Sequence, residues 1–169
     1  HVAARRQFGQ RLADQPLVYY RFDEASGTLA FNSGVLGAAA NGTYNATVSL
    51  GNPSLVPAFG YAAGFNNTNS SVAVPALGTN NQVTIEFWAK PRTFGVTSPG
   101  NPPHSGYNSI YTADSYVPGA LHTHFINPSP NQRWQLAINP SHTDIEAGNS
   151  GLFPSNSWVH LAATHDSAA

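Results

Sequence analysis

Acidic side chains are the first residues of this chain to test for catalytic chemistry, and they are few. Asp144 and Glu146 alternate along a possible strand and would share one of its faces. Two carboxylates about 5 Å apart can cleave a glycosidic bond with retention, but Gly148 and Asn149 interrupt the strand shortly after this pair. Asp23 and Glu24 are adjacent at the end of a predicted strand, where such side chains bind the backbone amides of a turn. We therefore expect a non-catalytic protein.

Two histidines have a spacing that can bind a metal. His122 and His124 alternate along a predicted strand, so that both would lie on one face. A transition metal needs at least a third ligand, and the sequence does not place His104 or His142 beside them. We interpret the pair as exposed or cross-strand-paired histidines.

Aromatic side chains are the residues best suited to binding a sugar, because their rings offer an apolar face with a polar rim. The chain has 3 Trp and 7 Tyr. The residues that we predict to bind carbohydrate are Trp88, Tyr111, Tyr116 and Trp134. The alternative for the two tryptophans is that they fill the core between two sheets.

The composition predicts many short strands. Of 169 residues, 41% are hydrophobic and only 9% are charged, against roughly 25% charged in an average globular protein. The 15 Gly and 13 Pro interrupt the sequence too often for long helices. A chain of this length can bury a core as one domain without disulfides.

The charge distribution excludes two classes of partner. The net charge is −1, and the one basic cluster is Arg5, Arg6 and Arg11, so a nucleic-acid backbone finds no basic stripe to bind. No run of 18 apolar residues occurs that would span a membrane as a helix. The chain has no Cys, which leaves the redox compartment open, and no Met, which suggests a processed chain or a fragment.

A change of period divides the chain near Pro16. Residues 2–13 predict a short helix with Phe8 and Leu12 on one face, so residues 1–16 form an N-terminal helical segment. Beyond it, residues 17–169 predict an all-β domain, a two-sheet antiparallel sandwich. The expected strands cover residues 17–22, 28–31, 43–48, 62–65, 71–74, 82–90, 109–112, 121–126, 133–138 and 157–165.

The clearest strand, residues 82–90, has two distinct faces. Val83, Ile85, Phe87 and Ala89 alternate with the set Thr84, Glu86, Trp88 and Lys90. One set should pack against the core, and the other should face away from it.

Several of these segments together resemble the laminin G-like domains of the concanavalin A-like lectin/glucanase superfamily. The similarity lies in Leu17–Gly27, in the turn Asn32-Ser33-Gly34, in residues 64–67 and 72–75, in Val83–Pro91, and in Trp158–Asp166. Asn32 replaces the family's usual acid, and His165 replaces a tyrosine. The resemblance implies a jelly roll of two curved sheets and a secreted or cell-surface recognition or adhesion module, with carbohydrate or another surface protein as the partner.

The resemblance also implies a calcium site and an incomplete sheet. Asp114 follows a strand similar to the one that leads to the calcium-binding acidic turn of pentraxins, although a capped turn is the simpler explanation of this residue. Calcium takes six to eight oxygen ligands, and the loop that supplies the others in pentraxins would follow Ala169. The family's last strands would follow there too, so we expect either a clipped chain or another chain that completes the sheet.

Two alternative functions remain open at this point. The first is a structural subunit of a surface layer, filament or large extracellular assembly. The second is a glycoside hydrolase of the same superfamily, which the resemblance alone suggests.

Overall fold

The computed structural model describes residues 13–66, 69–92, 107–112, 121–126, 133–138, 145–147 and 155–166. The chain divides into two compact units, with the boundary between Thr79 and Asn80. The predicted N-terminal helix lies outside the described residues apart from its last position, and that prediction stays open.

The first unit consists of short antiparallel strands. One sheet has the order β1-β2-β5, and β3 pairs with β4 in a second. Two short 3₁₀ helices, η1 and η2, lie between the strands. The bounds are β1 Leu29–Ala30, η1 Gly37–Ala40, β2 Gly42–Tyr44, β3 Ser49–Pro53, η2 Pro57–Phe59, β4 Tyr61–Gly64 and β5 Val72–Ala73.

The strand predicted over residues 17–22 is wrong, because its backbone groups bond elsewhere. A single bridge joins Tyr20 to Asn32. The Tyr19 amide donates to the Asn32 side-chain oxygen at 2.7 Å, and the Leu36 amide donates to the Leu17 carbonyl at 3.1 Å. Gly34 packs so closely on this segment that a Cβ there would lie 2.6 Å from the Pro16 carbonyl oxygen. A tight turn has thus replaced the sheet partner that a strand would need.

The acidic pair of the first unit makes contacts other than the predicted bonds to the amides that directly follow it. Glu24 accepts hydrogen bonds from the Phe31 amide at 2.8 Å and from the Tyr44 hydroxyl at 2.6 Å. Asp23 forms an ion pair with Arg21 at 2.5 Å. Both carboxylates are therefore engaged in structural contacts.

Buried Tyr44 gives the first unit a pH-dependent stability. The ring is 5% exposed, and its burial, together with the hydrogen bond to Glu24, raises the pKa of the Tyr44 hydroxyl well above its usual range. An unfolded tyrosine ionises near pH ~10, so the stabilisation is complete below that pH and is lost as the pH rises above it. In denaturant titrations at increasing alkaline pH, we expect Tyr44→Phe to lose less of its free energy of unfolding than the wild type. Tyr61→Phe should lose as much as the wild type, because the ring of Tyr61 is 46% exposed. Equal slopes in both variants would contradict the assignment.

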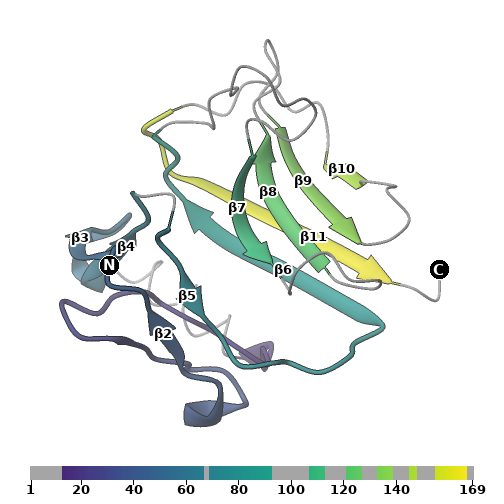
Figure 1. The fold of residues 1–169 in the computed structure, drawn as a ribbon, viewed down its shortest axis with the longest axis horizontal. Helices are drawn as coiled ribbons and strands as arrows, with labels where there is room; N and C mark the ends of the chain where they lie inside the picture. The colour runs from purple at the N-terminus through teal and green to yellow at the C-terminus, as the bar shows by residue number, and fades with distance from the viewer. Residues whose placement is uncertain are drawn as a thin grey trace. The chain divides into compact units, whose positions relative to one another are not determined.

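The second unit contains a long antiparallel ribbon and a four-stranded sheet. In the ribbon, β6 (Gln82–Ala89) pairs with β11 (Val159–Asp166) along its whole length. The sheet has the order β10-β9-β8-β7. Figure 1 shows β7, β8 and β9 side by side as a layer separate from the ribbon. The bounds are β7 Tyr107–Thr112, β8 Leu121–Ile126, β9 Arg133–Ile138 and β10 Ile145–Ala147.

The core of the second unit lies between these two layers. Phe125 on β8 and Trp134 on β9 are buried, and Phe87 and Leu161 of the ribbon pack against them. The rings of Phe87 and Trp134 meet edge to face at 5.6 Å and 79°. The Trp134 indole N–H donates to the Thr123 hydroxyl, so the buried polar atom is satisfied. The predicted antiparallel β-sandwich is confirmed.

Candidate functional site

The ribbon presents a polar face on the side opposite the core. Along both strands, half-buried residues alternate with exposed ones, as the period of a β-strand requires. Four residues of the half-buried set pack on the buried cluster of the sheet: Phe87, Ala89, Leu161 and Ala163. The exposed set therefore points away from the sheet. We call this exposed set the outer face, and it consists of Gln82, Thr84, Glu86, Trp88, His160, Ala162, Thr164 and Asp166.

The register of the ribbon brings these residues together in cross-strand pairs. Trp88 lies opposite His160, and Gln82 lies opposite Asp166 at the other end. Between them, Glu86 pairs with Ala162, and Thr84 pairs with Thr164. The outer face is therefore four pairs long and two strands wide.

An exposed aromatic ring marks one end of the outer face. The Trp88 side chain is 45% exposed although it is large and apolar. The His160 ring lies against it, with centroids 4.9 Å apart and planes tilted by 33°. The His160 Nε2 atom is 3.6 Å from the Glu86 carboxylate, which makes an ion pair when the imidazole is protonated. An apolar ring is thus bordered by a hydrogen-bonding imidazole and a carboxylate.

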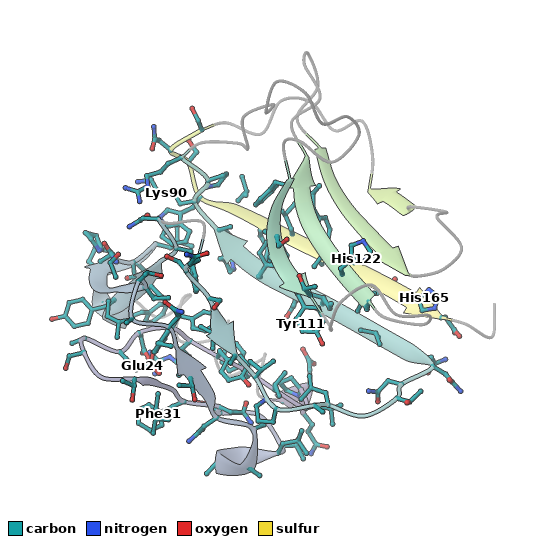
Figure 2. All side chains as sticks on the ribbon, viewed as in Figure 1. Glu24, Phe31, Lys90, Tyr111, His122 and His165 are labelled. Carbon is teal, nitrogen blue, oxygen red and sulfur yellow. The ribbon has the colours of Figure 1, made fainter. Side chains whose placement is uncertain are left out.

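The other end of the outer face is purely polar. The Gln82 side-chain amide donates to the Asp166 carboxylate at 2.8 Å. The residues between the two ends, Thr84, Ala162 and Thr164, have small side chains. Figure 2 marks the two limits of the ribbon, with Lys90 beyond one end and His165 near the other.

The structure separates the aromatic residues that the sequence predicts to bind carbohydrate. Trp88 is on the outer face, but Trp134 is 2% exposed in the core, so we leave Trp134 out of the candidate site. Tyr111 on β7 is half-buried, and this burial raises the pKa of its hydroxyl. Tyr116 lies outside the described residues. The candidate site therefore keeps one of the four.

The structure leaves the predicted calcium ligand untested. Asp114 lies outside the described residues, so the calcium prediction stays open. His122 on β8 is buried, and of His124 only the backbone position is described. Within the ranges that the structure describes, no three His, Asp or Glu side chains are grouped to hold a metal ion.

Among the described residues, no helix is long and apolar enough to cross a membrane.

The acidic pair considered for glycosidase chemistry stays untested at the level of side chains. Asp144 lies outside the described residues, and Glu146 is placed in β10 by its backbone alone.

Two residues of the site, Glu86 and His160, were not predicted as such from the sequence. Alternation along β6 already placed Glu86 on the same face as Trp88. The partner strand was the missing information, because pairing His160 with Trp88 depends on a register between distant segments. The sequence did contain one signal for His160, which is the alternation of side chains along Val159–Asp166 that the structure shows as an exposed and a half-buried face.

Comparison with known proteins gives one match. A family model described as the concanavalin A-like lectin/glucanases superfamily matches residues 66–169. No curated protein and no solved structure matches the chain significantly. The matched range is more than half of the chain and contains both strands of the ribbon.

Proposed function

Because this chain belongs to the concanavalin A-like lectin/glucanase superfamily, we propose that it is a non-catalytic recognition module that binds carbohydrate on the outer face of the β6–β11 ribbon. The superfamily's description covers both lectins and glucanases, so the fold alone does not decide between binding and hydrolysis. The observation that carries the proposal is the exposed Trp88 ring with His160 and Glu86 at its border. As part of the same proposal, we assign the module to a secreted or cell-surface protein.

The chemistry of the outer face suits a sugar. Sugar rings have apolar C–H faces and polar hydroxyl rims, which match an aromatic ring surrounded by hydrogen-bonding groups. Covering the exposed part of Trp88 would remove apolar surface from water, worth roughly 25 cal/mol per Å². Glu86 accepts hydrogen bonds, whereas the His160 ring both donates and accepts in its neutral form. Apolar and polar contacts are therefore available within one short stretch of the ribbon.

The positions of the carboxylates on the outer face favour binding over hydrolysis. Glu86 and Asp166 are the two acids of this face. Asp166 pairs with Gln82, four residues along β6 from Glu86, which separates the two backbone positions by roughly 13 Å. Glycosidases hold their two carboxyl groups ~5 to ~9.5 Å apart across the bond that they cleave. The described acids of this face therefore do not match a hydrolytic pair.

Tryptophan fluorescence offers a direct test on the unmodified chain. Among its tryptophans, Trp88 is exposed, Trp158 is half-buried and Trp134 is buried. A polysaccharide that covers Trp88 should shift the emission to shorter wavelength and reduce quenching by acrylamide. Retention on polysaccharide affinity gels should identify the same ligands. Absence of retention and of any spectral change across a broad panel of glycans would refute the proposal.

A further inference from the structure

The dimensions and charge of the outer face point to one class of glycan. Resting on the proposed function, we infer that the ligand is an uncharged glycan chain of several sugar units, lying along the ribbon from Trp88 to the Gln82–Asp166 pair.

The length of the outer face calls for more than one sugar unit. Trp88 and Gln82 are six residues apart on β6, which corresponds to roughly 20 Å along an extended strand. Across the ribbon, the two strands lie only about 4.8 Å apart. The face is therefore much longer than wide, and a ligand that contacts both ends must run parallel to the strands.

The side chains differ in size along this direction. The large Trp88 and His160 occupy one end, and the long Gln82 side chain meets the Asp166 carboxylate at the other. The two central pairs carry Thr84, Thr164 and Ala162, with Glu86 as the single long side chain among them. A chain stacked on Trp88 can thus pass over short side chains before it reaches the amide and carboxylate at the far end.

The charges along the outer face favour a neutral ligand. Glu86 lies beside the aromatic end, and Asp166 lies at the polar end, so a sulfated or carboxylated glycan would bring like charges close to both. Among the described basic residues on this side of the ribbon, His160 lies beside Glu86, and Lys90 follows β6 beyond Trp88 (Figure 2). Carboxylates also accept hydrogen bonds from sugar hydroxyls, which are donors. The binding should accordingly depend little on salt.

A series of neutral oligosaccharides of increasing length, with one repeat unit, tests this inference. We expect the affinity measured by calorimetry to rise with length until the chain spans the ribbon and then to level off. Gln82→Ala removes the amide at the far end, so it should weaken the longest oligosaccharide by about fivefold and leave the shortest unchanged. Asn81→Ala, at an exposed position just outside β6, is the matched control and should change neither affinity.

The outcomes separate this inference from the proposed function. Affinity that is independent of length, or a preference for a sulfated polysaccharide that weakens in salt, would overturn the inference and leave carbohydrate binding in place. Equal weakening of short and long oligosaccharides by Gln82→Ala would also overturn it. Absence of binding to any glycan would refute both.

Discussion

The Trp134→Ala variant is expected to lose about 3–5 kcal/mol of its free energy of unfolding. Trp134 is 2% exposed and packs edge to face on Phe87 across the two layers of the second unit. Phe125 is its buried neighbour, and Leu161 of the ribbon packs on the same cluster. Removing the indole leaves a cavity that the opposing layers can close only in part. A loss of this size is a large share of the stability of an ordinary domain.

Urea titration of the purified chain checks the Trp134→Ala prediction, with circular dichroism as the readout because the change removes a fluorophore. If the variant is too unstable to purify, Trp134→Phe keeps most of the volume and should show a smaller loss. A midpoint unchanged from the wild type in both variants would show that the core does not depend on this ring.

The hydrogen bond of the same indole can be tested separately. Thr123 is fully buried, and its hydroxyl accepts from the Trp134 N–H. Thr123→Val has nearly the same volume but leaves the N–H without this acceptor, which costs about 1–3 kcal/mol. Thr123→Ser retains the hydroxyl and should lose less than Thr123→Val; the reverse order would contradict the assigned contact.

The sequence predicted the second unit better than the first, and the reason is strand length. The strands predicted over residues 121–126 and 133–138 have the observed bounds. The strand predicted over residues 82–90 begins where predicted, and the observed strand ends one residue earlier. Their alternation extends over six to eight residues, which is long enough to identify a strand from the sequence. In the first unit the strands are two to five residues long, so alternation carries little information there.

Side-chain hydrogen bonds explain why residues 17–22 do not form the predicted strand. Residues 17–22 have the composition of a strand, but the Asn32 side chain binds the Tyr19 amide, and the Gly34 turn occupies the place of a partner strand. The side chain of an Asn competes for backbone groups in this local manner. A pattern of apolar residues does not reveal such competition.

The candidate site was predictable in kind but not in composition. The sequence identified Trp88 as an aromatic ring available for a sugar, because alternation placed it opposite Phe87 on β6. It could not separate Trp88 from Trp134, since both are tryptophans within strands. What separates them is which face of each strand packs on the other layer, and that depends on tertiary contacts.

Trp88→Ala should reduce the affinity for the glycan by about thirtyfold, which corresponds to about 2 kcal/mol. The ring is the large apolar surface of the outer face, and the imidazole of His160 rests against it. Without the indole, the sugar loses its stacking surface, and His160 loses the neighbour that helps to hold its ring beside Glu86. Isothermal titration with the ligand identified for the wild type measures the change.

A structural loss would mimic a binding loss, so Trp88→Phe and a stability measurement accompany this variant. Because Trp88 is 45% exposed, Trp88→Ala should shift the unfolding midpoint much less than Trp134→Ala does. Trp88→Phe keeps an aromatic face and should recover most of the affinity, since stacking needs a ring rather than the indole N–H. If Trp88→Ala binds as tightly as the wild type while remaining folded, the glycan lies elsewhere on the molecule, and the outer face of the ribbon is not its site.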